Sequence, residues 1–177
     1  MRVISGKYKG KNLIGFDIDG TRPTMDRVKE SLFASIQNKV KNSVVLDLFA
    51  GSGSLGIEAL SNGASEAYFI DNNIELINII KKNTSGMNDK MHIIKSDYKS
   101  ALELLNNSNI KFDIIFLDPP YKLNLINDCL DFIVKYNLLN KDGIIVCEYE
   151  TEQIENDTLK LIKDKKYGSK KIKIFEL

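Results

Sequence analysis

The stretch at residues 47–60 reads DLFAGSGSLGIEAL, and it contains the pattern G-x-G-x-x-G at Gly51, Gly53 and Gly56. The apolar run at residues 43–48 predicts a strand, and residues 54–62 predict a helix that stops at a glycine. Glycines between a strand and a helix let the backbone turn tightly and approach a ligand with no side chain in between. This stretch therefore predicts an α/β fold with a ligand-binding loop.

The order of strand and helix continues through the middle of the chain. Further strands are predicted at residues 66–71, 91–95, 113–117 and 143–148, with helices around 74–80, 100–105 and 125–134. Strict alternation is typical of a mostly parallel sheet with helices on both faces. Near the end, residues 159–163 and 171–175 flank the turn sequence YGSK and predict a hairpin.

The first 40 residues do not alternate in this way. Residues 2–4 and 12–14 predict a small separate β-hairpin, and residues 26–36 predict a helix. A chain of 177 residues with no linker or repeat is expected to form a single domain, residues 1–177. Its expected parts are an N-terminal hairpin and helix extension, residues 1–40, and a catalytic core, residues 41–177.

The second informative stretch is FDIIFLDPPY, residues 112–121. Four apolar residues predict a strand buried on both faces, and Pro119 and Pro120 end its pairing because neither can donate a hydrogen bond. Asp118 is then expected at a carboxyl end of the sheet, where open α/β folds bind ligands. An Asp-Pro pair is also an ordinary way to start a turn, so this motif alone leaves both interpretations open.

Two more acids follow predicted strands. Asp71 lies twenty residues after Gly51, where an acid can hydrogen-bond the hydroxyls of a ribose, and Asp97 follows the next strand, within reach of an adenine edge. Together with the glycine loop they predict an adenosine-binding row. Each acid taken alone is equally compatible with a helix cap or a turn.

Two other enzyme classes share parts of this pattern. A G-x-G-x-x-G loop also occurs in nicotinamide-dependent dehydrogenases, but the chain offers no substrate domain and no histidine or lysine placed as a proton donor. The sequence FDIDGT at residues 16–21 spells the nucleophile motif of haloacid dehalogenase-type phosphatases. That motif needs a long apolar strand before it, and the preceding residues are polar, so we interpret it as a turn.

The net charge of +1 hides a separation of charge along the chain. Residues 1–29 carry seven Lys/Arg and three Asp, and residues 160–177 carry seven Lys and two acids, whereas the middle is acidic. Basic ends around an acidic centre indicate contact with a polyanion, although lysines also protect strand edges from aggregation.

The remaining composition is that of an ordinary globular protein. No apolar run reaches the roughly 18 to 20 residues of a membrane span. Cys129 and Cys147 are interpreted as reduced packing residues of a cytoplasmic protein, His92 as a surface or strand-edge residue, and no metal site is expected.

The motifs, taken in order, resemble the S-adenosylmethionine-dependent methyltransferases that act on exocyclic amines of nucleic acid bases. With the flanks MRVISGKYKGKNL, TRPTMDRVKESLF and KKYGSKKIKIF, the chain resembles the bacterial RsmD family, which methylates guanine N2 in 16S ribosomal RNA. The similarity covers nearly the whole chain. Two departures are a tyrosine, Tyr149, where the family often has histidine, and the acidic segment at residues 16–20.

The resemblance implies a Rossmann-like class I methyltransferase fold, with a seven-stranded sheet whose last strand is antiparallel. It implies S-adenosylmethionine as cofactor and 16S rRNA or the small ribosomal subunit as partner, with no obligate protein partner. It assigns the cofactor to Asp47, Phe49, Gly51, Gly53, Asp71 and Asp97, and the base to Asp118, Pro119, Pro120 and Tyr121. RNA contacts are expected from Lys7, Lys9, Lys11, Arg22, Thr24 and Arg27, as part of a basic front that extends to Lys29.

The chemistry of an amine explains the second stretch. The lone pair of an aryl amine is delocalised into its ring, and two acceptors, the Asp118 carboxylate and the Pro119 carbonyl, can hold the N–H bonds so that the lone pair is aimed at a methyl donor. Tyr121 offers a face on which a flipped-out base can stack. An adenine-N6 methyltransferase, or an RNA-binding assembly factor with little turnover, remains as an alternative.

Overall fold

The structure, a computed structural model, describes residues 1–15, 22–120 and 123–177, without the side chains of residues 22–25. Within these residues one seven-stranded sheet runs in the order β3-β2-β1-β4-β5-β7-β6. Its strands are β1 Val44–Asp47, β2 Glu66–Asp71, β3 Lys90–Lys95, β4 Phe112–Leu117, β5 Leu139–Tyr149, β6 Lys160–Tyr167 and β7 Lys170–Glu176.

The directions of the strands confirm the expected methyltransferase sheet. Strands β1 to β5 pair in parallel, and β7 lies antiparallel between β5 and β6. All of the parallel strands therefore end at the same edge of the sheet, and the turn between β6 and β7 lies at that edge as well, because β7 begins beside the end of β5.

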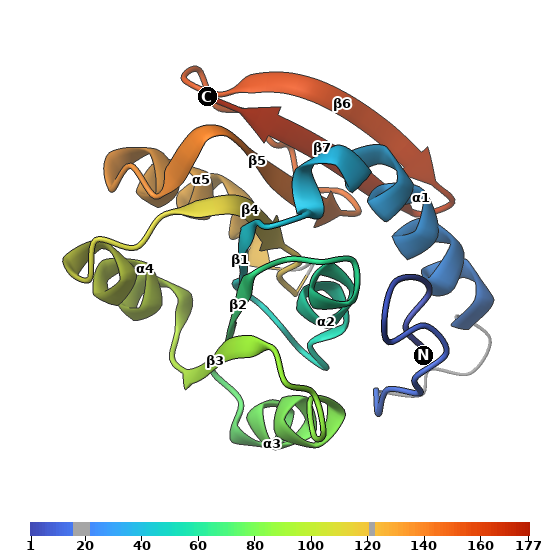
Figure 1. Cartoon of the computed structure of the whole chain (residues 1–177). Helices are drawn as coiled ribbons and strands as arrows, with labels where there is room; N and C mark the ends of the chain where they lie inside the picture. The colour runs from blue at the N-terminus through green and yellow to red at the C-terminus, as the bar shows by residue number, and fades with distance from the viewer. Residues whose placement is uncertain (16–21, 121–122) are drawn as a thin grey trace.

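Five helices of the described chain cover both faces of the sheet: α1 Arg22–Val40, α2 Ser54–Ser61, α3 Ile74–Asn83, α4 Tyr98–Asn107 and α5 Ile126–Lys135. Figure 1 shows α1, α2 and α3 on one face and α4 and α5 on the other. Successive strand residues alternate between two hydrophobic cores: Val45 packs with the first group of helices and Leu46 with the second. Both residues are fully buried.

The N-terminal segment forms the expected hairpin, but the hairpin is not separate from the core. Its two arms meet in an antiparallel bridge between Arg2 and Asn12, and the N–H groups of Val3 and Leu13 donate to the carbonyls of Lys11 and Met1, each at 2.9 Å. The segment is docked on α2, where the fully buried Glu58 accepts hydrogen bonds from the backbone N–H groups of Ile4 at 2.9 Å and Ser5 at 2.8 Å. Pairing between the arms and anchoring to the core together order these residues.

Two element boundaries also differ from the sequence expectation. Helix α1 begins at Arg22 and not near residue 26, because a proline such as Pro23 is tolerated in the first helical turn. Strand β5 begins at Leu139 and not at Gly143. A register shift beside Phe112 and the positive φ of 63° at Asp142 interrupt the apolar pattern there, so the early part of the strand reads as a turn.

Smaller expectations are confirmed. Cys129 on α5 and Cys147 on β5 are buried free cysteines that pack in the same hydrophobic core. His92 lies on the edge strand β3, stacked on Tyr68 with ring centroids 4.2 Å apart.

Among the described residues, none of the helices combines the length and the apolar character that a membrane crossing requires. The phosphatase-like segment at residues 16–21 lies outside the described residues.

Candidate active site

Acidic side chains gather where the parallel strands end. Asp47 is the last residue of β1, Asp71 the last of β2, and Asp118 directly follows β4. Glu148 lies one residue before the end of β5. The strands are parallel neighbours, so their carboxyl ends meet at one edge, and this arrangement places several carboxylates around the same space.

The glycine loop shapes the floor of this space. Gly51 has a φ of 55°, a conformation that favours glycine, and a Cβ added there would meet nothing within 4 Å, so the residue faces an open cavity. Its N–H donates to Asp71 at 3.0 Å. Gly56 serves packing instead, because a Cβ there would lie 2.3 Å from the Phe69 ring. The glycines of the motif thus divide between ligand approach and helix–sheet contact.

A large cavity of about 710 Å³ lies over the ends of β1 to β4. Phe49 and Tyr98 stand on its wall with ring centroids 5.8 Å apart. Its wall combines carboxylates, which can accept from hydroxyl and amine groups, with aromatic and apolar side chains, which can pack against a base. The lining includes Phe49, Gly51, Asp71, Asn72, Asp97, Tyr98, Asp118, Pro119 and Leu125. A cradle floored by a bare glycine and flanked by carboxylates and aromatic rings fits S-adenosylmethionine.

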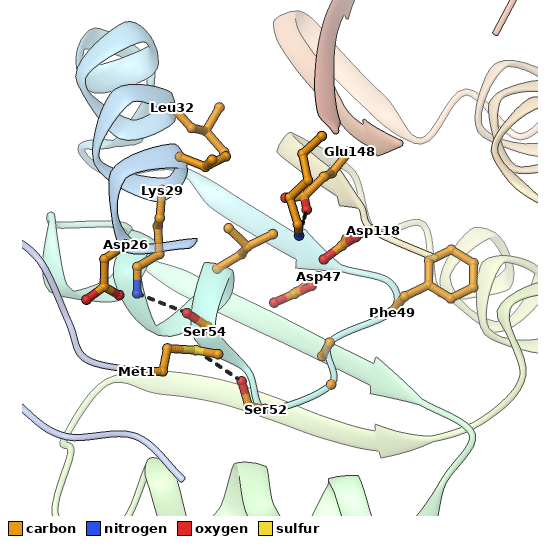
Figure 2. Close-up of a pocket in the computed structure, with 15 residues that line it drawn as sticks. Met1, Asp26, Lys29, Leu32, Asp47, Phe49, Ser52, Ser54, Asp118 and Glu148 are labelled. Atoms are coloured by element: carbon orange, nitrogen blue, oxygen red, sulfur yellow. Dashed lines mark hydrogen bonds and ion pairs between the residues drawn. The ribbon is translucent and has the colours of Figure 1, made fainter. Parts of the chain in front are cut away.

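A second cavity, of about 270 Å³, lies between α1, the glycine loop, the ends of β4 and β5 and the start of β7. Figure 2 shows its charged and apolar walls, with Asp26, Lys29 and Leu32 projecting from α1. Phe49, Gly51 and Asp118 line both cavities. Asp118 therefore lies where the large cavity, which suits the cofactor, meets the second cavity; this place is called the junction below.

The electrostatics at this junction are unusual for carboxylates. Burial raises the pKa of Asp47 to about 7, against the hydrogen bond that its Oδ2 accepts from Gly56 at 3.0 Å. Burial also raises the pKa of Asp118 well above its ordinary value, and the nearby charge of Glu148 adds to this rise. Lys170 opposes it. Perturbed acids in a cavity are typical of functional sites.

Glu148 and Lys170 form an ion pair across β5 and β7 at the wall of the second cavity. The sequence interpretation gave neither residue a role. Glu148 carries the signal that identified Asp71 and Asp118, an acid where an apolar strand ends. Lys170 has no such local signal, because only the pairing of β7 with β5 brings it to the site.

The two acids of the predicted adenosine row already have backbone partners. Asp71 accepts hydrogen bonds from Gly51 and from the Asn73 N–H at 2.9 Å. Asp97 caps α4 by accepting from the Ser100 N–H at 3.0 Å, and this hydrogen bond lowers its pKa. Both still line the large cavity. Each therefore combines the cap or turn role with a place at the candidate cofactor site.

The DPPY motif is described in part. Asp118 is half-buried, Pro119 is buried and Pro120 is exposed, and the Pro120 carbonyl accepts from the Leu123 N–H at 3.1 Å. Tyr121 lies outside the described residues.

The predicted RNA-contacting residues divide into two groups. Lys7 forms an ion pair with Asp89, and Lys11 donates to the Ser85 carbonyl at 3.2 Å, so both help to hold the N-terminal segment on the core. Lys9 and Arg27 are exposed and line a polar cavity beside α1 together with Arg2. Arg22 begins α1, but its side chain and that of Thr24 lie outside the described part of the structure.

Lys29 was expected to belong to the basic N-terminal surface that contacts RNA, and the structure corrects this expectation. Its side chain is only 6% exposed, and its Nζ donates to the Arg2 carbonyl at 2.7 Å and to Ser54 at 2.9 Å. It also lies 3.1 Å from Glu58. Burial lowers the pKa of Lys29, and Glu58 acts against this. Lys29 ties α1, the N-terminal segment and the start of α2 together and cannot reach a phosphate backbone.

Comparisons with known proteins agree with this geometry. A family model described as conserved hypothetical protein 95 matches residues 1–176. The Bacillus subtilis protein YlbH is 42% identical over 154 residues, 86% of this chain and 84% of that protein. Ribosomal RNA small subunit methyltransferase D of Haemophilus influenzae is 33% identical over 180 residues, 99% of this chain and 93% of its own. The solved structure of yhhF from Escherichia coli superimposes with a TM-score of 0.84 at 28% identity, covering 99% of this chain and 96% of that one.

Proposed function

Because the chain belongs to the family of ribosomal RNA small subunit methyltransferase D, we propose that it transfers a methyl group to the exocyclic N2 amine of a guanine in 16S ribosomal RNA. S-adenosylmethionine is the cofactor, and it supplies a methyl group carried on a sulfonium. The observation that supports this best is the place of Asp118, which lines both the adenosine-sized cavity and the cavity beside it.

The residues of the large cavity would hold the cofactor in defined parts. Gly51 would leave room for the amino acid portion, the Asp71 carboxylate would accept from the ribose hydroxyls, and Asp97 would bind the adenine amine. Gly53, predicted to share the role of Gly51, lies against Ile57 and Ile80 and lines no part of this cavity. Phe49 covers the junction side, and Asp47 stands below the loop, where its bond to Gly56 fixes the start of α2. We infer these assignments from the lining of the cavity and from the family resemblance.

Asp118 and the backbone after it act on the amine. The Asp118 carboxylate accepts one N–H bond and the Pro119 carbonyl the other, so that the nitrogen lone pair leaves conjugation with the ring and points toward the methyl donor. The rigid Asp-Pro-Pro backbone keeps the two acceptors in place, because proline fixes its own φ and restricts the residue before it. Most of the acceleration then comes from positioning and electrostatics.

The choice of base follows from the same acceptors. An ionised carboxylate accepts only, and guanine presents N1–H beside N2–H, whereas adenine presents one donor beside an acceptor. The target base is unpaired, since sequence-specific RNA recognition mostly takes exposed bases. Tyr121 is proposed as its stacking partner, and Lys9 and Arg27 as contacts to the RNA backbone. We propose 16S rRNA or the small ribosomal subunit as the partner of the protein, and the cytoplasm as its location.

Transfer of a labelled methyl group tests the proposal. The protein is incubated with labelled S-adenosylmethionine and, separately, unmodified small subunits, naked 16S rRNA and DNA, and the product is digested to nucleosides. N2-methylguanosine in either RNA sample is the expected result. N6-methyladenosine would replace the proposal with the adenine alternative. RNA binding without any transfer would favour an assembly factor.

A further inference from the structure

The hairpin of β6 and β7 ends at the edge of the sheet where the candidate active site lies. Strand β6 finishes at Tyr167, β7 starts at Lys170, and the turn between them is exposed. Figure 1 shows this hairpin beside α1, and the hydroxyl groups of Tyr167 and Ser31 join the two elements at 2.7 Å. Lys170 also lines the second cavity. The end of the hairpin therefore lies next to the site and is open to a large substrate.

The paired charges of the hairpin are arranged differently at its two ends. Far from the active site, Lys160 on β6 lies opposite Glu176 on β7, and their side chains form an ion pair of 3.1 Å. Near the active site, Lys166 lies directly opposite Lys171. Opposite charges that face each other across an antiparallel pair stabilise it, whereas like charges destabilise it. The hairpin therefore has a matched pair at one end and a repulsive pair at the other.

Lys165 adds to the positive charge near the active site. It is exposed, as is Lys166, and the two point to opposite faces of the hairpin because successive strand residues alternate. No ion pair involves either side chain within the described part of the chain. The acid beside them in the strand, Asp164, lies opposite another lysine, Lys173. The end of the hairpin thus presents lysine side chains on both faces.

Protection of a sheet edge explains only part of this pattern. Strand β6 is an edge strand, and lysines on such a strand hinder its pairing with another chain. Lys171 has no such role, because β7 is an interior strand between β5 and β6. Its Nζ lies 5.6 Å from the centroid of the Tyr149 ring. A lysine held opposite Lys166 costs folding stability, and a bound anion would relieve the repulsion between the two.

We propose that the end of the β6–β7 hairpin binds the phosphate backbone of the RNA substrate through Lys165, Lys166 and Lys171. This inference rests on the proposed function, and it adds a second surface to the backbone contacts proposed for Lys9 and Arg27. An RNA whose base enters the junction has to lie over this edge of the sheet. Lysine binds phosphate as a point charge, so the surface holds the backbone and reads no sequence.

The salt dependence of RNA affinity tests the proposal, with naked 16S rRNA as the probe in a filter-binding assay. Lys165→Ala with Lys166→Ala is expected to reduce the log–log slope by roughly 1.4, at about 0.7 per lost contact to a single-stranded phosphate. The matched control is Lys141→Ala with Lys160→Ala, which removes the same charge from two exposed lysines near the starts of β5 and β6. The control is expected to leave the slope unchanged. Equal changes in both double variants would mean that only net charge matters, and would overturn the inference.

The repulsive pair provides a second test with two readouts. Lys166→Glu places a carboxylate opposite Lys171 and is expected to raise the midpoint of thermal unfolding by roughly 1 to 3 °C. The same variant is expected to reduce the salt slope of RNA affinity by roughly 0.7 or more. A lysine with only a structural role would not exchange stability against RNA binding in this way. A more stable variant with unchanged RNA affinity would count against the proposed surface.

The wild-type protein gives a measurement that needs no variant. Bound 16S rRNA is expected to protect Lys165 and Lys166 from acetylation by a lysine-modifying reagent, as measured by mass spectrometry. Lys141 and Lys160 should react as they do in the free protein. Equal modification of all four lysines with and without RNA, in a preparation that methylates RNA, would overturn the inference and leave the proposed function standing. Absence of any methyl transfer to RNA would instead overturn the proposed function.

Discussion

The two ends of the sheet each contain a glutamate and a lysine paired across neighbouring strands, but the surroundings of the pairs differ. At the end where the parallel strands begin, Glu66 accepts from Lys90 at 2.9 Å, Tyr68 at 3.0 Å and lies 2.6 Å from His92. Burial alone would raise the pKa of Glu66, and these hydrogen bonds outweigh it and lower the pKa. At the other end, Glu148 has Lys170 beside it while Asp118 and Asp47 remain poorly compensated.

This difference in surroundings distinguishes carboxylates that stabilise the fold from carboxylates that can bind a ligand. A carboxylate such as that of Glu66, which three side chains surround, stabilises the folded state and has little capacity left for a ligand. Carboxylates whose burial is not fully compensated cost folding free energy, and proteins retain such groups where a ligand will supply the missing partner. By this criterion the functional end of the sheet is recognisable without a bound molecule.

The largest effect is expected from removing the Asp118 carboxylate, which lies at the active-site end of the sheet. Asp118→Ala is expected to lower the rate of methyl transfer on the order of 10² to 10⁴-fold, the usual loss for a positioned charge-stabilising group. The fold and the affinity for S-adenosylhomocysteine should stay close to wild type. Single-turnover transfer at saturating cofactor measures the effect, with Glu66→Gln as the matched control at the opposite end. Equal rates in Asp118→Ala and wild type would mean that the carboxylate is only a turn residue.

The cofactor row gives a smaller effect. Asp71→Ala is expected to weaken binding of S-adenosylmethionine and S-adenosylhomocysteine alike by about 1 to 3 kcal/mol, because the Gly51 N–H and the ribose hydroxyls both lose an acceptor. Calorimetry measures the affinities, and circular dichroism confirms that the variant is folded. Unchanged affinity would remove Asp71 from the cofactor site.

The same distinction between engaged and available charge applies to the basic residues. Lys9 and Arg27 have no ion-pair partner within the described residues, whereas Lys7 is paired with Asp89. Lys9→Ala with Arg27→Ala should reduce the log–log salt slope of RNA affinity by roughly 1.4, at about 0.7 per lost contact to a single-stranded phosphate. Lys7→Ala serves as the control and should leave the slope close to wild type. A larger change in the control than in the double variant would reverse the assignment.

The smallest effect is expected at the compensated end. Glu66→Gln should lower the free energy of unfolding by about 1 kcal/mol at pH 7. The lowered pKa of Glu66 means that its contribution is present above its unfolded-state pKa of about 4.3 and is lost as the pH falls through the folded-state value. Urea unfolding at several pH values between about 3 and 7 measures this. A difference that persists unchanged at the lowest pH would show that the charge of Glu66 contributes nothing.

Local pattern was enough to predict the middle of the fold. The strands that end at Asp47 and Asp71, and the strand directly before Asp118, are short apolar runs followed by turn residues, and this pattern indicates both where a strand is buried and where it ends. The acids at those ends were therefore predictable as neighbours. The early part of β5 was not, since its bulge places Asn, Lys, Asp and Gly where an unbroken strand would have apolar residues.

Residues that act through distant partners escaped the sequence interpretation. Lys29 looks like the other basic residues of the first thirty, and only the packing of α1 against α2 reveals that it is buried beside Glu58. Lys170 belongs to a lysine-rich hairpin, and its neighbours Lys165 and Lys166 are exposed. The antiparallel insertion of β7 beside β5 distinguishes it from them, and that pairing is a property of the whole sheet.

The anchoring of the N-terminal segment on Glu58 also orders events during synthesis. Ile4 and Ser5 leave the ribosome before α2, because the carboxylate that holds them lies 54 and 53 residues further along the chain. Closing so long a loop is slow compared with forming a helix, and it must wait until α2 has been translated and has packed on β1. Ile4 and Ser5 are thus made before α2 but reach their final positions only after it has formed, and until then the nascent chain carries the basic segment at residues 1–11 undocked.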